Sequence, residues 1–326
     1  MEIEIVGKKR KVPDFMIAGG MKCGTTSLHH ILNSHPLIFI PAPEIHFYDM
    51  DNYFQHQDSF IYRSNQWYYP NFTQDLDKSF DWYESWFKNT SNAQFLGEDS
   101  TIYLTSSIAH ERIAKYAPYT KMIIMLRDPA SRTYSQYSHL ILTGRLSCSF
   151  EDAIQGGLGN LLDRSMYKKQ IENFFKFLPR ENFHFILFEE FVKDTQKITK
   201  QVLEFLEIPF PENFEVDQSK THKNKSLVPR SITLQKLKNL LVKDVNNLRY
   251  AEFFAPINGF PVENHKNNQT FNHLINQIHK LINPRQNKKF PPMKPETKHF
   301  LNSYLKQQNE GLEKIIAKNL QDFWYK

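Results

Sequence analysis

The chain has 326 residues, with 41 Lys and Arg against 35 Asp and Glu, and 14% of its residues are aromatic. This size fits one three-layer α/β domain, and since no linker or repeat divides the chain, we expect a single domain over residues 1–326. The net charge of +6 predicts an anionic partner without requiring nucleic acid. Two cysteines exclude a disulfide framework, and because the 13 histidines show no ligand-like spacing, we expect no metal site.

The first 13 residues are charged and lack the apolar core of a signal peptide. Elsewhere, no window approaches the ~18 consecutive apolar residues that a membrane-spanning helix needs. We therefore expect a cytoplasmic protein without a membrane span. The basic run at residues 8–11 is interpreted as a solvated turn before the first strand, with a nucleic-acid patch as the less favoured alternative.

Residues 14–32 predict a strand, a glycine turn and a helix N-terminus. An apolar run at residues 15–18 leads into Gly19 and Gly20, and helical spacing begins near Thr25. Such a turn points several backbone N–H groups and the positive end of the helix dipole at one spot, which suits a phosphate or sulfate. The residues of this predicted anion loop are Lys22, Cys23, Gly24, Thr25, Thr26 and Ser27.

Lys22 adds a mobile positive charge to the anion loop, but its position differs from that of the lysine in ATPases and GTPases. Their loop reads GxxxxGK[ST], whereas Lys22 precedes Gly24 by two positions. Cys23 is interpreted as a small residue in a crowded turn. The alternative is a reactive thiol, because a helix N-terminus lowers the pKa of a thiol.

Strand-like and helix-like segments alternate through the rest of the chain, which implies a parallel sheet with right-handed crossovers. We expect an α/β fold: a three-layer, P-loop-like domain with a central parallel sheet flanked by helices. Residues 50–78 lack clean periodicity and are interpreted as a loop-rich excursion. The predicted strands are residues 15–18, 37–40, 95–98, 121–126 and 183–188, and the predicted helices are residues 25–33, 105–116, 130–143, 166–177 and a segment that ends before Pro209.

The strand at residues 121–126 is a continuous apolar run, as expected for a parallel strand buried on both faces. Arg127 leaves this strand at its C-terminal end, the edge where open α/β sheets bind ligands. Ser135 follows eight residues later, in the second turn of the next predicted helix. Arg127 is therefore a candidate ligand-binding residue. The alternative is a local ion pair between Arg127 and Asp128, with Ser135 as a solvated helix serine.

These motifs resemble those of sulfotransferases that use 3′-phosphoadenosine 5′-phosphosulfate (PAPS). The KxGTTSL loop resembles their 5′-phosphosulfate loop. The LRDPxxRxxSxY pattern resembles their 3′-phosphate motif, which implies that Arg127 and Ser135 hold the 3′-phosphate. Three further segments are similar to the heparan sulfate sulfotransferase branch, and to its bacterial relatives in particular: PEIHFY at residues 43–48, RSMY ending at Tyr167, and NKSLVPRS at residues 224–231.

The resemblance also implies roles for individual residues. Glu44 is the implied general base, Lys22 the cation that meets charge on the leaving phosphate, and His46 a group that orients Glu44 or the acceptor, or a structural histidine. PAPS is the implied co-substrate, and no metal is required. The residues implied in binding PAPS are Lys22, Cys23, Gly24, Thr25, Thr26, Ser27, Arg127, Ser135, Tyr167, Lys225 and Arg230.

One segment departs from the family pattern. Many heparan-type enzymes have a lysine after the glutamate of GEK(T/S)P, whereas this chain has Asp99 there, and Thr101 replaces the proline. Asp99 therefore argues against heparan-like acceptors. It is interpreted as binding a different acceptor or as a second acid/base group.

The acceptor is expected to be a hydroxyl group on a carbohydrate or a glycolipid, rather than a phenol. Flat aromatic side chains suit sugar rings, and they gather in residues 50–78 and at Trp82, Tyr83 and Trp86. We expect these aromatic residues to border the mouth of the acceptor site, with ordinary packing as the alternative.

Two rival functions are consistent with parts of the sequence. The first is a P-loop kinase or NTPase, in which Asp128 would act as the metal-binding aspartate at a strand end, although the position of Lys22 argues against it. The second is a non-catalytic module that binds 3′-phosphoadenosine 5′-phosphate (PAP), although Glu44 and Lys22 are both present. Nothing in the sequence indicates an oligomeric state.

Overall fold

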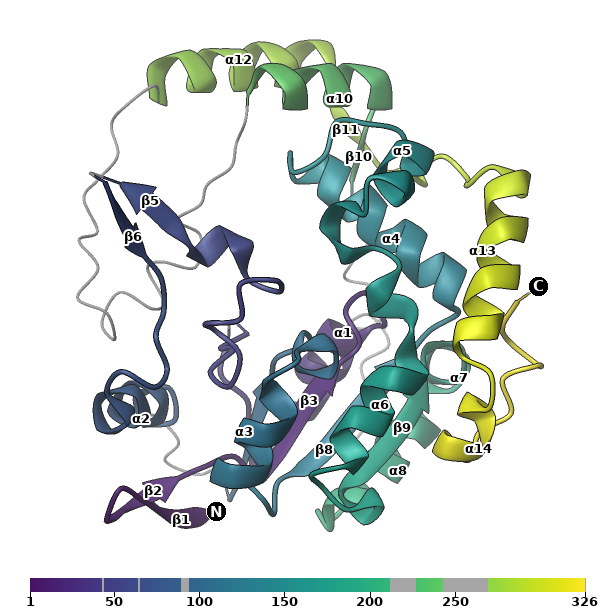
Figure 1. Ribbon diagram of the computed structural model, residues 1–326. Coiled ribbons are helices and arrows are strands. Elements are labelled where there is room, and N and C mark those ends of the chain that lie inside the picture. The colour runs from purple at the N-terminus through teal and green to yellow at the C-terminus, as the bar shows by residue number, and fades with distance from the viewer. Residues whose placement is uncertain (43, 64, 89–93, 212–226, 243–268, 326) are drawn as a thin grey trace.

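The computed structural model describes residues 1–42, 44–63, 65–88, 94–211, 227–242 and 269–325 (Figure 1). Its centre is a five-stranded sheet in which all neighbouring strands are parallel. The strands are β3 (Phe15–Gly19), β4 (Ile38–Phe39), β7 (Phe95–Asp99), β8 (Lys121–Leu126) and β9 (Phe183–Leu187), in the spatial order β4-β7-β3-β8-β9. The predicted α/β fold with a central parallel sheet is confirmed.

Helices cover both faces of this sheet because the side chains of each strand alternate between two apolar clusters. In β8, Met122 and Ile124 join the cluster that contains α3 (Ala109–Tyr116) and α6 (Tyr167–Phe175). Ile123 and Met125 join the other cluster, which contains α1 (Thr25–Leu32) and α8 (Thr195–Leu206). The continuous apolar run of β8 thus serves two buried faces, as a central parallel strand requires.

The other elements surround this three-layer core. The remaining α-helices are α2 (Leu76–Ser85), α4 (Pro129–Leu142), α5 (Phe150–Gln155), α7 (Phe188–Lys193), α10 (Ile232–Leu241), α12 (Gln269–Ile282), α13 (Pro295–Gln308) and α14 (Leu312–Ile316). Three antiparallel pairs lie outside the main sheet: β1 (Glu2–Ile5) with β2 (Lys8–Lys11), β5 (Ile61–Arg63) with β6 (Gln66–Tyr68), and β10 (Val228–Pro229) with β11 (Arg285–Gln286). No helix in the described ranges has the length and apolar character needed to cross a membrane.

Two predicted segments differ from the structure. The helix predicted at residues 105–116 begins at Ala109, because the Ser106 hydroxyl accepts a hydrogen bond from the Ala109 N–H (3.3 Å) and Tyr103–Thr105 forms a separate 3₁₀ turn. The excursion at residues 50–78 contains the β5–β6 hairpin and the start of α2. It is therefore more ordered than the absence of periodicity indicated.

The interpretation of residues 8–11 as a solvated turn was wrong. These residues form β2, and Arg10 is only 3% exposed. Its guanidinium donates to three carboxylates of α2, those of Asp77, Asp81 and Glu84. Because side chains alternate between the two sides of a strand, one cation of the basic run points inward. Its contacts connect the β1–β2 hairpin to α2.

We predict that Arg10→Ala destabilises the protein by about 2 kcal/mol, because the substitution removes several charge-assisted hydrogen bonds and leaves three carboxylates facing one another. Urea denaturation followed by circular dichroism measures this change. Lys9→Ala, at the neighbouring exposed position, is the matched control and should leave the midpoint unchanged. Equal midpoints for both variants would show that the Arg10 cluster does not stabilise the fold.

Candidate functional site

The anion loop joins β3 to α1 at the carboxyl edge of the sheet. Gly24 adopts a left-handed conformation (φ 94°) at the N-cap of α1, and a Cβ there would lie 2.8 Å from Cδ2 of Phe188. Only glycine meets both conditions without strain. Within the described part of the chain, no side chain caps α1 at this end, so its first-turn amides face the loop as anion donors.

Arg127 lies against this loop, as the two sequence motifs predicted. Its Nη1 donates to the carbonyl oxygen of Lys22 (3.3 Å), and its guanidinium carbon lies 4.7 Å from the centre of the Phe188 ring. Burial lowers the pKa of Lys22, and the nearby charge of Arg127 lowers it further. Two cations that repel each other at one loop are arranged for an anion between them.

Arg132 is a third cation at this place, and the sequence analysis assigned it no role. It is fully buried and donates to Ser165 Oγ (2.6 Å), Gln136 Oε1 (2.8 Å) and the carbonyl oxygen of Leu161 (2.6 Å). These partners carry no formal charge and do not offset the positive charge of Arg132. That charge acts on Lys22 through space. It adds to the positive potential at the loop.

Tyr167 connects Arg127 with the loop from the side of α6. Its hydroxyl donates to the carbonyl oxygen of Arg127 (2.9 Å) and lies 3.9 Å from Sγ of Cys23. Ser135 is half-buried in the second turn of α4, the helix that follows Arg127. The loop, Arg127, Tyr167 and Ser135 therefore come from elements that meet at one edge.

The described part of the chain does not bring the last two residues implied in PAPS binding to the anion loop. Lys225 is outside the described residues. Arg230 is exposed beside β10, and its backbone N–H donates to the carbonyl oxygen of Pro284 (3.0 Å). The carbonyl oxygen of Arg230 accepts from Nζ of Lys288 (2.7 Å). In the described part of the chain, no contact joins Arg230 to the anion loop.

Glu44 is a half-exposed carboxylate, with 36% of its side chain accessible, held on one oxygen by three contacts. Oε2 accepts from the Thr101 hydroxyl (2.9 Å) and the Thr101 N–H (3.3 Å), and lies 3.2 Å from Nε2 of His46. Burial acts to raise the pKa of Glu44, but the hydrogen bond and charge of His46 outweigh it and lower the pKa. Glu44 is therefore ionised at neutral pH and fixed in direction.

A chain of buried groups continues behind His46. Nδ1 of His46 lies 3.9 Å from Oδ1 of Asp49, and the same oxygen lies 3.0 Å from Nε2 of His56. Burial acts to lower the pKa of His46, but the hydrogen bond to Glu44 and the charges of Glu44 and Asp49 raise it. His46, Asp49 and His56 also lie close enough together to hold a metal ion, although their spacing in the sequence did not predict a metal site.

Asp99 ends β7 at the same edge, and Oδ2 lies 3.2 Å from Nδ1 of His29 in α1. Asp99 is 5% exposed. Burial raises its pKa to about 6, although the His29 contact acts in the opposite direction and Glu44 adds to the rise. His29 therefore forms an acid/base pair with the residue that departs from the family pattern.

The aromatic residues after position 80 do not all lie where the acceptor hypothesis placed them. Tyr83 is fully buried, stacks on Phe47 with 4.0 Å between ring centres, and donates to the buried carboxylate of Glu98. Packing therefore accounts for Tyr83.

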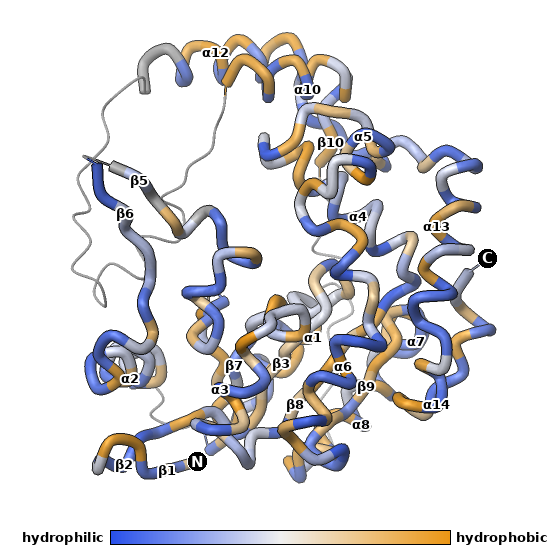
Figure 2. Tube along the Cα trace, viewed as in Figure 1, coloured by the Kyte–Doolittle hydropathy of each residue, from blue (hydrophilic) through white to orange (hydrophobic). Residues whose placement is uncertain are grey.

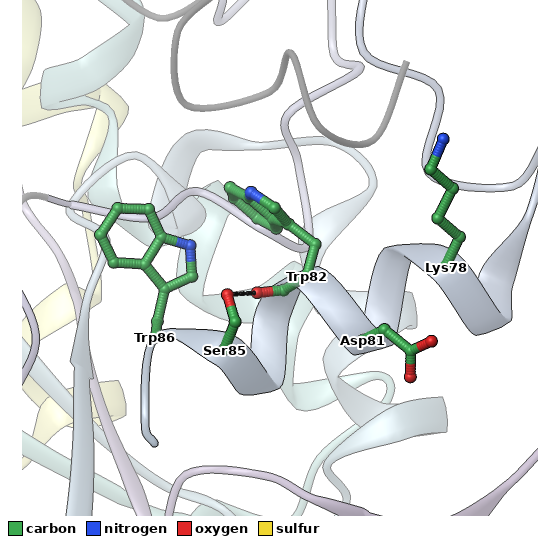
Figure 3. Close-up of a pocket in the computed structure, with 5 residues that line it drawn as sticks. All are labelled: Lys78, Asp81, Trp82, Ser85 and Trp86. Carbon is green, nitrogen blue, oxygen red and sulfur yellow. Dashed lines mark hydrogen bonds between the residues drawn. The ribbon is translucent and has the colours of Figure 1, made fainter. Parts of the chain in front are cut away.

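Trp82 and Trp86 line an open pocket of about 580 Å³ on α2 (Figure 3). Its other lining residues are Lys78, Asp81 and Ser85, so no residue of the candidate site contributes to it.

The comparisons with known proteins agree with this geometry. Residues 13–212 match the model of the sulfotransferase family, and the chain therefore belongs to the sulfotransferase family. A solved sulfotransferase from Alicyclobacillus acidocaldarius superposes with a TM-score of 0.59 at 23% identity, covering 96% of this chain and 98% of that one. The family resemblance found in the motifs and the predicted fold are both confirmed.

Several curated relatives are heparan sulfate enzymes. The human bifunctional heparan sulfate N-deacetylase/N-sulfotransferase 3 is 25% identical over 329 residues, which cover 94% of this chain and 30% of that protein. The human bifunctional heparan sulfate N-deacetylase/N-sulfotransferase 2 is 34% identical over 137 residues, covering 40% of this chain and 13% of that protein. The mouse heparan sulfate glucosamine 3-O-sulfotransferase 6 is 25% identical over 205 residues, covering 61% and 53% respectively. The chain thus matches at most about half the length of these relatives.

We predict that Cys23 is unreactive, because burial raises the pKa of its thiol to about 11 despite the neighbouring helix N-terminus. Ellman's reagent at about pH 8 should therefore titrate only Cys148, which is partly exposed, in the native protein. Both thiols should react after denaturation, which serves as the control. Rapid native modification of Cys23, detected in a Cys148→Ser variant, would favour the reactive-thiol alternative.

Proposed function

We propose that the protein transfers a sulfuryl group from PAPS to a hydroxyl acceptor on a carbohydrate or glycolipid. The observation that carries this proposal is the meeting of two features at one sheet edge. One is a glycine loop with the cations Lys22 and Arg127, and the other is the accessible, ionised carboxylate of Glu44, whose charge acts on Lys22. Membership of the sulfotransferase family supports the reaction class.

PAPS would bind along the loop and the neighbouring helix α4. The α1 amides, Lys22 and the hydroxyls that follow Gly24 suit the 5′-phosphosulfate, because they combine a helix dipole with a mobile cation. Arg127 and Ser135 would hold the 3′-phosphate, and Tyr167 would keep Arg127 in place through its backbone oxygen. Lys225 and Arg230 stay proposed contacts of the nucleotide, through the segment that leads into β10.

The transfer step follows from these positions. The acceptor oxygen attacks sulfur while the bond between sulfur and the phosphate oxygen breaks in line, and the acceptor proton moves to the Glu44 carboxylate. Lys22 stabilises the negative charge that builds up on the leaving phosphate of PAP. His46 orients Glu44 through its Nε2, so that the free carboxylate oxygen faces the acceptor. No step in this sequence uses a metal.

The acceptor side combines Glu44 with the Asp99–His29 pair. Relatives named as heparan sulfate and glucosamine sulfotransferases support a sugar acceptor. Asp99 places a buried acidic group at the position where many heparan-type enzymes have a lysine, which would favour an anionic chain. We therefore propose a neutral or amine-bearing sugar rather than a heparan-like polyanion.

The kinase alternative needs Asp128 as a metal-binding aspartate. In the structure, the Asp128 carboxylate instead accepts the N–H of Ser131 (2.8 Å) at the N-cap of α4 and the N–H of Tyr325 (3.1 Å).

We predict that PAP raises the melting temperature of the protein, whereas ADP and AMP barely change it, because Arg127 and Ser135 grip a 3′-phosphate. Arg127→Ala should weaken PAP binding by about 1.5–3 kcal/mol. Arg145→Ala, at an exposed position beyond α4, is the matched control. Equal stabilisation by AMP and PAP would rule out the 3′-phosphate role of Arg127 and Ser135.

The transfer itself is tested with isotope-labelled PAPS and a panel of sugars, glycolipids and phenols, read by mass spectrometry. Glu44→Gln should lower turnover by about 10²–10⁴-fold, because the amide accepts no proton, while binding PAP nearly as well as the parent. Glu181→Gln changes an exposed glutamate in the same way and should keep full activity. PAP binding without transfer to any acceptor would support the non-catalytic alternative, and full activity of Glu44→Gln would move the base to Asp99 or His46.

A further inference from the structure

Helices α10 and α12 lie together at one end of the molecule and are tied to each other at their ends (Figure 1). Asn283, which follows α12, donates from Nδ2 to the carbonyl oxygen of Ser231 (2.8 Å). Its Oδ1 accepts from the Ser231 N–H (2.6 Å) at the N-cap of α10. The antiparallel β10–β11 pair lies beside this junction, so the two helices form one unit, the α10–α12 face.

Helix α10 turns polar side chains toward the protein and apolar side chains toward the solvent. Gln235 and Asn239, each 5% exposed, face the protein, and Gln235 Nε2 donates to Asn239 Oδ1 (2.8 Å). Asn239 Nδ2 donates to the carbonyl oxygens of Ile141 (2.8 Å) and Leu146 (2.7 Å), which lie at and beyond the end of α4. The helix is therefore anchored by polar groups. Apart from Thr233, its exposed residues are apolar, and they are between 37% and 66% exposed: Leu234, Leu237, Leu240 and Leu241.

Helix α12 repeats this arrangement. Asn272, Asn276 and His279 are half-buried, and Asn283 beyond its end is fully buried. Four exposed aliphatic residues recur at the spacing of three or four that forms a stripe on one side of a helix. They are Leu274 (56% exposed), Ile278 (48%), Leu281 (82%) and Ile282 (55%). Figure 2 shows the hydrophobic colouring along both helices.

The charge of this face has one sign. Residues 227–242 and 269–294 contain eight of the 41 Lys and Arg residues of the chain and none of its 35 Asp and Glu residues. Lys294 pairs with Glu151 (3.3 Å) and Lys236 lies over the Tyr137 ring (5.6 Å). Five other cations of these stretches are exposed: Arg230, Lys280, Arg285, Lys288 and Lys289.

We propose that the α10–α12 face docks on the surface of an anionic lipid bilayer. Aliphatic stripes flanked by lysine and arginine are the pattern with which interfacial helices enter the boundary between head groups and acyl chains. The one-signed charge selects this occupant over a second copy of the chain, because two such faces would bring like charges together. The proposal is independent of the transfer chemistry, so its test needs no activity measurement.

The full-length protein is tested by co-sedimentation with vesicles of phosphatidylcholine alone and of phosphatidylcholine mixed with phosphatidylglycerol. We expect binding to the mixed vesicles only, with loss of binding at ~0.5 M NaCl. The double variant Leu237→Glu/Ile278→Glu should bind at least about tenfold more weakly. Two apolar side chains that would be buried in the bilayer are lost, and two negative charges face the anionic lipid instead. Both positions are exposed, so circular dichroism should show an unchanged fold.

The matched control is Phe177→Glu/Val192→Glu, which changes two apolar residues of similar exposure, 44% and 48%, on other elements. It should bind the mixed vesicles like the parent. Failure of the parent protein to bind them at low salt would overturn the proposal. So would concentration-dependent dimerisation, measured by light scattering and abolished by Leu237→Glu/Ile278→Glu, without vesicle binding, because the face would then be an interface between copies of the chain.

Discussion

The Phe188 ring is the contact on which the geometry of the candidate site depends. Phe188 follows the edge strand β9, and its ring leaves no space for a Cβ at Gly24, so the anion loop closes tightly onto the start of α7. The same ring supports the guanidinium of Arg127 at 4.7 Å. Because one side chain fixes both the backbone turn and the cation, the distance between the two proposed phosphate subsites is set by the packing of the sheet and not by mobile side chains.

Three carboxylates close to this edge have different tasks because their surroundings differ. Glu98 is fully buried, and its carboxylate accepts the hydroxyls of Tyr83, Tyr103 and Ser100, so it holds the core together. Glu44 is half-exposed and ionised beside His46, which suits a proton acceptor. Asp99 is buried with a raised pKa, so it changes charge in a pH range where Glu44 does not. The environment, more than the residue type, separates the structural role of Glu98 from the proposed catalytic role of Glu44 and the proposed acceptor-side role of Asp99.

The sequence predicted the features that arise from short segments and missed those that join distant ones. The buried strands and the anion loop are contiguous patterns, so β3, β8 and Arg127 were found at the right places. Arg10 was missed because its partners lie on α2, more than 60 positions away. The pairing of Asp99 with His29 likewise depends on how β7 and α1 meet. The chain from His46 to His56 is local, but its residues have no recognisable ligand spacing, so nothing in the sequence indicated that they come together. Ser100 and Thr101, which hold the segment of Glu44 and His46, follow β7 and leave no local signal for that task.

The positive charge of the chain is distributed unevenly. The net charge of +6 was interpreted as a sign of an anionic partner such as PAPS, yet the loop and its surroundings hold few cations: Lys22, Arg127, Arg132 and Arg164. The excess lies in residues 227–242 and 269–294, which include α10 and α12, and the rest of the chain carries slightly more acidic than basic residues. Small clusters of desolvated cations suffice to bind a nucleotide, because burial strengthens each charge–charge interaction. An exposed cation is screened by salt, so a surface must gather many of them to attract a large anionic partner. Charge number and burial therefore separate the two kinds of anion recognition that we propose for this chain.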